Sequence, residues 1–122
     1  MNTRRDFVRN LSALAFTAPL MAETPKVKNK VCFFTKHLIG LSYDDIAGLG
    51  AEMGVDGIEA PIRPSAGHIK PEQVVDELPK FVEALKKQNL EMMIMTSGIN
   101  EVSAEQRTEE ILRTAAKLGV KR

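Results

Sequence analysis

Three residues that end helical segments divide most of the chain into units of similar length. Gly54, Asn89 and Gly119 each close a segment with helical spacing of apolar residues, and each is followed directly by an apolar run. The three residues are spaced 35 and 30 positions apart. A continuous apolar run is typical of a parallel strand covered on both faces, and a helix usually connects two parallel strands. The spacing therefore predicts a repeated strand–helix unit and an α/β fold.

The expected strands are short and end in polar loops. They are predicted over residues 31–35, 55–60 and 90–95. Pro61 and Pro64 are expected to stop the second strand, because proline cannot donate a backbone hydrogen bond. Val120 would begin a fourth strand.

The expected helices follow from capping residues and apolar spacing. Ser42 predicts the start of a helix that ends at Gly54, with Ile46, Leu49 and Met53 on its buried side. Pro79 lacks the N–H that a helix interior needs, so the next helical region is predicted to divide into one helix over 71–76 and another that begins near residue 77 or 78. In the last unit the predicted buried stripe comprises Ile111, Leu112, Ala115 and Leu118, and Ser103 with Gln106 predicts the helix start.

Composition limits the kinds of function that this chain can have. The 122 residues are 43% hydrophobic and 27% charged, which is typical of one globular domain. A formal charge of +1 and few aromatic residues argue against a nucleic-acid partner. The single cysteine, Cys32, lies in an apolar run and is expected to be a buried, inert thiol.

The N-terminus differs from the rest of the chain. Arg4 and Arg5 are followed by Phe7, Arg9 and then an uncharged apolar segment over 11–22. This arrangement resembles a twin-arginine export signal. The apolar segment is too short to span a bilayer, so no stable membrane anchor is expected. An amphipathic helix of the mature fold is the alternative, but the polar and apolar residues are segregated end to end and not interleaved.

The resemblance divides the chain at residue 22. It implies a signal peptide over 1–22 that the twin-arginine machinery reads, a linker over 23–30, and a folded part over 31–122 in the periplasm. Ala22 suits the last position before cleavage, whereas Leu20 is bulkier than the usual residue two places earlier. The signal holds three of the 17 basic residues and one of the 16 acidic residues, so the mature chain would be nearly neutral.

A doubly wound sheet and an eight-stranded barrel both begin with strand–helix units. The loop after the first strand, residues 36–40, has no glycine-rich phosphate cradle of the dinucleotide-binding kind. We therefore expect the first three βα units of a (β/α)8 TIM barrel. Such a barrel needs about 250 residues, so the expected barrel is incomplete and this chain is expected to be the opening segment of a longer protein.

Four local patterns suggest a family for residues 31–122. They are Phe34-Thr35-Lys36-His37-Leu38, Gly54-Val55-Asp56-Gly57-Ile58-Glu59, Arg63-Pro64 followed by Gly67-His68, and Asp76-Glu77-Leu78-Pro79. In this order they resemble the sugar phosphate isomerase/epimerase family with the xylose isomerase-like TIM barrel. The resemblance implies a sugar (phosphate) isomerase or epimerase in which a divalent metal, Mn, Mg or Zn, polarises a carbonyl while acids move a proton next to it. Most of the family's metal ligands and catalytic acids come from the fourth to eighth strands. We therefore assign no catalytic residue to this chain and expect this fragment to hold no metal by itself.

The resemblance places four substrate-binding candidates at the carboxyl ends of strands. They are His37 after the first strand, and Glu59, Arg63 and His68 at and after the second. Thr96, after the third strand, is a further candidate. The alternative for His37 is a cap on the strand end.

Each candidate after the second strand also has a structural alternative. Glu59 is expected to form an ion pair with Arg63 and to orient substrate secondarily. Arg63 could hold a phosphate or carboxylate with two hydrogen bonds. His68 could contact sugar hydroxyls or be an ordinary loop histidine, and it has no partner at metal-ligand spacing.

Three functions remain open from the sequence. The first is a metal-dependent sugar isomerase or epimerase acting on a small sugar or sugar derivative. The second is a lyase or hydrolase on the same barrel, such as a dehydratase or an endonuclease-like enzyme, because a fold does not determine a reaction. The third is an inactive truncated product. The sequence leaves the oligomeric state open.

Overall fold

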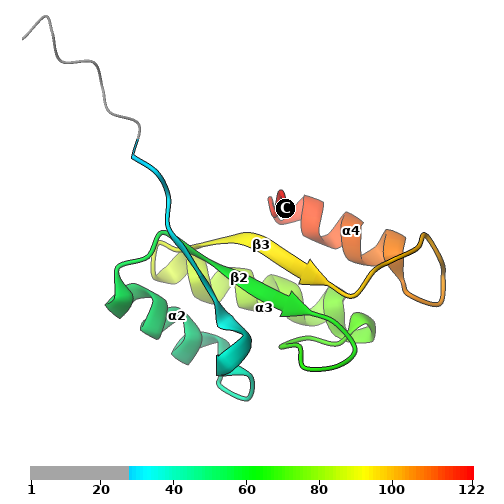
Figure 1. Ribbon diagram of the computed structural model, residues 1–122, viewed down its shortest axis with the longest axis horizontal. Coiled ribbons are helices and arrows are strands. Elements are labelled where there is room, and N and C mark those ends of the chain that lie inside the picture. Colours follow the sequence, from blue (N-terminus) through cyan, green and yellow to red (C-terminus); the bar gives the residue numbers. More distant parts are fainter. Residues whose placement is uncertain (1–27) are drawn as a thin grey trace, which may run out of the picture.

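The structure, a computed structural model, describes residues 28–122 and contains one parallel sheet (Figure 1). Its strands are β1 (Cys32–Phe34), β2 (Gly57–Ile62) and β3 (Glu91–Ser97), in the order β1-β2-β3. The α-helices are α2 (Tyr43–Met53), α3 (Val74–Lys87) and α4 (Thr108–Lys117), with short 3-10 helices η1 (Thr35–Leu38) and η2 (Pro71–Gln73). The predicted α/β fold is confirmed. The predicted signal peptide, 1–22, and residues 23–27 of the predicted linker lie outside the described residues.

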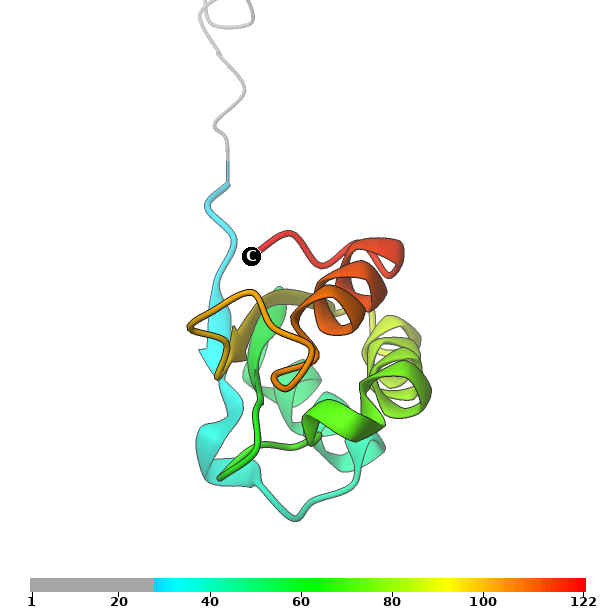
Figure 2. The same ribbon diagram turned by 90° about the vertical axis from the view of Figure 1, so that its right-hand side faces the viewer.

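The helices lie on one face of the sheet (Figure 2). Ile58, Ala60 and Ile62 alternate along β2 and are fully buried in the core with the helices. Successive side chains of a strand point to opposite faces, so Glu59 points to the other face of the sheet. The core therefore occupies the space between sheet and helices, and the opposite face is left for the candidate site.

The end of the chain lies next to β3. The backbone N–H of Met95 donates to the carbonyl oxygen of Arg122 at 2.7 Å. The segment after α4 thus lies beside the free edge of β3, but residues 120–122 form no strand, so the fourth strand expected from Val120 stays a prediction. The addition of strands in chain order on one side is compatible with a barrel. The described residues themselves form only a small parallel sheet.

Strand β2 extends further than predicted and includes Pro61. The prediction that Pro61 ends the strand is wrong, because β1 pairs with β2 only as far as Glu59. The Pro61 carbonyl accepts from the His68 N–H at 2.8 Å. The N and C=O groups of one strand residue point to the same side, which for Pro61 is the side of β1. Because β1 no longer pairs with β2 at this position, no β1 carbonyl needs the N–H that Pro61 lacks.

Helix α2 begins and ends as predicted but buries a different face. The Ser42 hydroxyl accepts from the Asp45 N–H, and Gly54 ends the helix with φ 71°. Leu49 and Met53, predicted to be buried, are 37% and 54% exposed. Ile46 is buried as predicted, together with Ala47 and Gly50, and a Cβ at Gly50 would lie 2.8 Å from Leu90 Cδ1. Close approach at Gly50 leaves the larger side chains at the edge of the contact.

Helix α3 continues through Pro79, so the predicted break is wrong. An interior proline costs about 3 kcal/mol. Against this, α3 buries a long apolar face, and each large side chain contributes about 1.5–3 kcal/mol when buried. These side chains are Val74, Leu78, Phe81, Val82 and Leu85.

Helix α4 begins five residues after the predicted cap. The Ser103 hydroxyl does accept from the Gln106 N–H, at 3.2 Å, but this bond forms a turn that precedes the helix. Arg107 then adopts φ 53°, and the buried Thr108 hydroxyl donates to the Glu101 carbonyl at 2.7 Å. The left-handed Arg107 separates the turn from the helix. Leu112, predicted to be buried, is 53% exposed.

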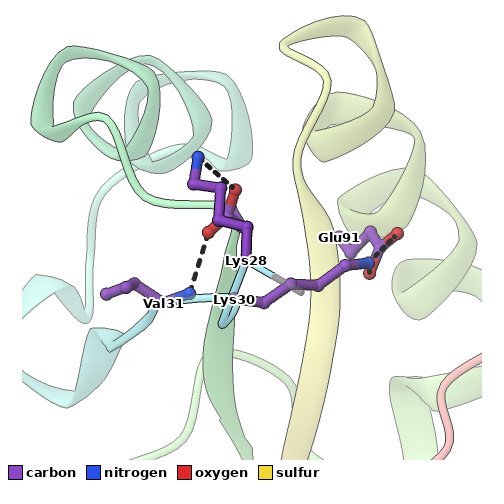
Figure 3. A network of polar contacts seen from close by, with 5 residues as sticks. Lys28, Lys30, Val31 and Glu91 are labelled. Carbon is purple, nitrogen blue, oxygen red and sulfur yellow. Dashed lines mark hydrogen bonds and ion pairs between the residues drawn. The ribbon is translucent and has the colours of Figure 1, made fainter. Parts of the chain in front are cut away.

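Residues 28–31 are attached to the sheet at the amino ends of its strands (Figure 3). The Val31 N–H donates to Asp56 Oδ2 at 2.8 Å, and the Asp56 N–H donates to the Val31 carbonyl at 2.8 Å. Lys30 Nζ lies 2.9 Å from Glu91 Oε2, and Lys28 Nζ lies 3.9 Å from Asp56 Oδ1. The described end of the predicted linker is therefore bonded to the strand starts.

Candidate functional site

Glu59 and Thr96 meet on the sheet face opposite the helices. The register pairs Glu59 with Ile94 and Pro61 with Thr96, so Glu59 and Thr96 lie two positions apart on one face. The Thr96 hydroxyl donates to Glu59 Oε1 at 2.6 Å, a short bond of the charge-assisted kind. Both side chains are half-buried. This pair joins two predicted candidates, Glu59 in the middle of β2 and Thr96 near the carboxyl end of β3. The carboxyl ends of strands are where α/β proteins bind ligands.

A β-bulge in β3 lies directly beside Glu59. The register of β2 and β3 shifts between Ile58 and Glu59, which leaves Met93 as the extra residue. A Cβ at Gly57 would clash with the Glu91 carbonyl oxygen and lie 2.5 Å from Met93 Cγ, so Gly57 makes room for the bulge. Bulges change the direction of neighbouring side chains and are frequent next to functional sites. The bulge thus sets which β3 residues face Glu59.

His68 contacts Thr35 and lies apart from the Glu59 carboxylate. Its Nε2 lies 3.1 Å from the Thr35 carbonyl oxygen and 2.8 Å from Thr35 Oγ1. A carbonyl oxygen can only accept, so Nε2 carries the proton and donates. The Thr35 hydroxyl in turn donates to the Glu59 backbone carbonyl at 3.0 Å. His68 is therefore connected to Glu59 through Thr35 and the β2 backbone.

Burial favours the neutral form of the His68 ring. Burial lowers its pKa below the ordinary value of 6.5, and the hydrogen bond to the Thr35 carbonyl opposes this effect only in part. The ring packs edge-on against Phe81, with ring centroids 5.5 Å apart. Within residues 28–122, Nδ1 has no hydrogen-bond partner, and no buried side-chain nitrogen or oxygen atom lacks one, so Nδ1 is open to solvent. His68 also borders a hollow of about 360 Å³ formed with residues 39–43 and Gly67.

Arg63 does not form the predicted ion pair with Glu59, so that prediction is wrong. Its Nε donates to the Ala66 carbonyl at 3.3 Å, and Glu59 bonds to Thr96 instead. The loop after β3 touches this residue, because a Cβ at Gly98 would lie 3.4 Å from Arg63 Cβ. The Nη1 and Nη2 atoms have no partner among residues 28–122. The guanidinium thus keeps donors that could bind an anionic group.

His37 is exposed in η1 and makes no side-chain hydrogen bond with the described part of the chain. Nothing in the structure brings it together with Glu59. The structure therefore separates the four predicted candidates: Glu59 faces the open side of the sheet, and His68 packs against the helix layer.

The sequence prediction missed Thr35 as part of this arrangement. Thr35 is completely buried, yet its hydroxyl contacts both His68 and the Glu59 carbonyl. The available signal was a hydroxyl residue directly after the apolar run of the first strand. That signal alone does not reveal the two partners, because they lie 24 and 33 positions away in the chain.

A second polar group lies beside Phe81 and was also missed. Tyr43 stacks on Phe81, with ring centroids 4.6 Å apart, and donates to Glu77 Oε2 at 2.9 Å. Burial, together with this bond to Glu77, raises the pKa of Tyr43. The hydrogen bonds from Lys80 and then Tyr43 lower the pKa of Glu77. This group connects α2 to α3, and within residues 28–122 no hydrogen bond joins it to Glu59.

The described residues do not fit the metal centre that the resemblance implies. Among residues 28–122, no three His, Cys, Asp or Glu side chains lie close enough to hold a metal ion. A hollow of about 450 Å³ near Lys30, Glu91 and Leu118 lies at the amino ends of the strands, away from Thr96. Lys30 and Glu91 are already paired with each other there.

No family model, curated protein or solved structure matches this chain. The family suggested by the sequence therefore stays a prediction. Within residues 28–122, no helix has the length and apolar character needed to cross a membrane. The Glu59–Thr96 pair and its surroundings form the candidate site.

Proposed function

We propose that this chain forms part of the substrate-binding wall of a metal-dependent sugar (phosphate) isomerase or epimerase built on a (β/α)8 barrel. Two features of the fold support the proposal. The parallel strands follow one another in chain order, and the helices lie on one face of the sheet, as in the wall of a barrel (Figure 2). The Arg122 carbonyl beside Met95 supports addition of the next strand at the β3 edge.

The hydrogen bond between Thr96 and Glu59 is the observation that carries the proposal. It holds the Glu59 carboxylate on the face that would line the barrel interior and ties it to Thr96, near the carboxyl end of β3. Oε1 is occupied by Thr96, whereas Oε2 has no partner among residues 28–122. A carboxylate oxygen accepts hydrogen bonds from hydroxyl groups, which are the main groups that a sugar presents. Glu59 would therefore bind and orient sugar hydroxyls.

Arg63 is proposed to take the anionic end of a substrate. Its Nε is used by Ala66, which fixes the base of the guanidinium and leaves Nη1 and Nη2 for a phosphate or carboxylate. His37, exposed after β1, would form the outer part of the same wall. These residues would bind the substrate. The acids that move a proton on the substrate would come from other strands.

Binding of sugars to the full chain tests this proposal. D-Xylose, D-xylulose and D-xylulose 5-phosphate would be titrated while amide chemical shifts are recorded. We expect shifts at Thr96 and Glu59, and weaker binding by about tenfold in Glu59→Ala, the ratio that corresponds to 1.4 kcal/mol. Glu52→Ala, an exposed carboxylate on α2, is the matched control and should bind like the unchanged chain. Absence of sugar binding, or equal binding by Glu59→Ala, would contradict the proposal.

We also propose export by the twin-arginine route to the periplasm. The support is the sequence alone, namely Arg4 and Arg5 followed by Phe7 and the apolar segment over 11–22. A reporter fused to residues 1–25 should be exported, and replacing both arginines by lysine should stop that export. Unchanged export of the lysine variant would refute this route.

A further inference from the structure

We infer that His68 is a positioning residue that holds Glu59 in place through Thr35, and that it does not itself bind substrate. The inference rests on the proposed role of Glu59 and adds the residues that support it. The sequence suggested that His68 contacts the substrate. We assign His68 a contact within the protein instead.

The first step concerns the direction of the hydrogen bonds. The Thr35 carbonyl requires a donor, so His68 Nε2 donates, and it donates to Thr35 Oγ1 as well. Thr35 Oγ1 is then free to donate its own proton, and its acceptor is the Glu59 carbonyl, 3.0 Å away. Every bond in this chain has one donor and one acceptor, so the chain has a single consistent direction from His68 to Glu59.

The second step concerns what the chain of bonds holds. Thr35 is the residue directly after β1, and Glu59 is the last β2 residue that pairs with β1. Beyond Glu59, β2 receives no strand hydrogen bonds from β1. The Thr35 hydroxyl therefore bonds to β2 at the point where the β1–β2 pairing ends, and it fixes the backbone of Glu59 there.

The third step connects the backbone of Glu59 to its side chain. Thr96 approaches the carboxylate from β3 at 2.6 Å, a distance with little tolerance for movement of either strand. Thr35 on one side and Thr96 on the other thus hold the same residue by its carbonyl and its carboxylate. Loss of the Thr35 bond would let the β2 backbone move and would lengthen the contact to Thr96.

The completely buried Thr35 explains why the support must come from His68. A buried polar atom that loses its hydrogen-bond partner destabilises the fold. His68, packed against Phe81, supplies the donor that completes the environment of this hydroxyl. A leucine at position 68 would leave the acceptor positions of Thr35 empty, whereas a glutamine could still offer an N–H.

Crystal structures of variants of the full chain test the inference. In Thr35→Val the separation of Thr96 Oγ1 and Glu59 Oε1 should exceed 3.5 Å, whereas Thr35→Ser should retain the bond. His68→Leu should lengthen the same contact, and His68→Gln should restore it. If Thr35→Val does not fold, the His68 pair decides the question, because it leaves Thr35 and its bond to Glu59 in the sequence. An unchanged contact in His68→Leu would overturn the inference, whatever Thr35→Val shows.

Nitrogen chemical shifts of the His68 ring give a second readout that packing alone would not change. In the unchanged chain Nε2 should carry the proton and Nδ1 the lone pair, and Thr35→Val should keep this form, because the backbone carbonyl of residue 35 remains as the acceptor. A proton on Nδ1 in the unchanged chain would overturn the inference. Sugar titrations separate this result from the proposed function: if Glu59→Ala binds like the unchanged chain, the proposed function fails whatever the ring nitrogens show.

Discussion

Thr96 donates its hydroxyl proton to the Glu59 carboxylate across two neighbouring strands, at an O–O distance of 2.6 Å. The two residues lie 37 positions apart in the chain and share the face of the sheet opposite the helices. The β-bulge at Met93 sets this register, and Thr35 holds the Glu59 backbone from the other side. The candidate site is therefore a product of three strands.

The Glu59–Thr96 bond should contribute measurably to stability. A double-mutant cycle with Thr96→Val and Glu59→Ala should give a coupling energy of about 1 kcal/mol, as expected for a half-buried hydrogen bond to a charged group. Urea unfolding followed by circular dichroism measures it. Thr114→Val is the control, because its hydroxyl bonds to the Glu110 carbonyl within α4 and its loss should change stability by less than about 0.5 kcal/mol. A coupling energy near zero would show that the bond does not form in solution.

Gly57 should be intolerant of any side chain. In Gly57→Ala the new Cβ meets the Glu91 carbonyl oxygen and the Met93 side chain, so we expect a loss of about 1–3 kcal/mol. Gly48→Ala is the matched control, because nothing lies within 4 Å of its Cβ position and α2 should gain up to about 1 kcal/mol. Thermal unfolding of both variants measures the difference. Equal effects of the two substitutions would contradict the close packing at the bulge.

Pro79 should weaken the helix that contains it. In Pro79→Ala a backbone N–H becomes available to the helix, and we expect stability to rise by about 1–3 kcal/mol. Pro71→Ala provides the comparison, since Pro71 begins η2, where a proline is favourable, and its replacement should cost up to about 1 kcal/mol. Urea midpoints of the two variants should therefore move in opposite directions.

The stability of the protein should depend on the protonation of His68. Burial lowers its pKa from 6.5, so the folded protein binds this proton less readily than the unfolded chain does. The contribution is complete above about pH 6.5 and is lost as the pH falls toward the lower folded-state pKa. We expect the urea midpoint to fall between pH 7 and pH 5.5, and to fall less in His68→Gln. A larger fall of the urea midpoint in His68→Gln would contradict a lowered pKa of His68 in the folded protein.

Asp56 should matter more than the lysines around it. Asp56→Ala removes the acceptor of the Val31 N–H, and we expect a loss of about 1–2 kcal/mol. Lys30→Ala removes only an exposed ion pair with Glu91 and should cost at most about 1 kcal/mol. Hydrogen exchange at the Val31 amide should accelerate in Asp56→Ala and remain nearly unchanged in Lys30→Ala. Similar exchange rates in the two variants would show that the ion pair holds this segment.

Features that depend on neighbouring residues in the chain could be predicted from the sequence. The strand–helix units, the Ser42 cap and the ends of helices at Gly54 and Gly119 all follow from local chemistry, and the structure has them. The exposure of Leu49 could not be predicted, because it depends on how closely Gly50 approaches Leu90.

The contacts of the candidate site depend on the relative positions of strands. The sequence placed Glu59 beside Arg63 because they are near in the chain, but the bulge at Met93 brings Thr96 to the carboxylate instead. His68 was correctly placed in the loop after β2, yet its contact with Thr35 depends on where β1 ends. Pairing across strands, and not the pattern within one, decides these partners.

The three-residue strand β1 also determines how the protein would respond to mechanical force. A pull applied at residue 28 reaches the exposed ion pairs of Lys28 and Lys30 and then the bonds between Val31 and Asp56, because these contacts attach the segment to the strand starts. Once those bonds rupture, only the short pairing of Cys32–Phe34 with β2 resists, whereas β2 and β3 pair along the whole of Gly57–Ile62. Traction from this end would therefore peel off β1, release the Thr35 bond to Glu59, and leave the contact of Glu59 with Thr96 to rupture later.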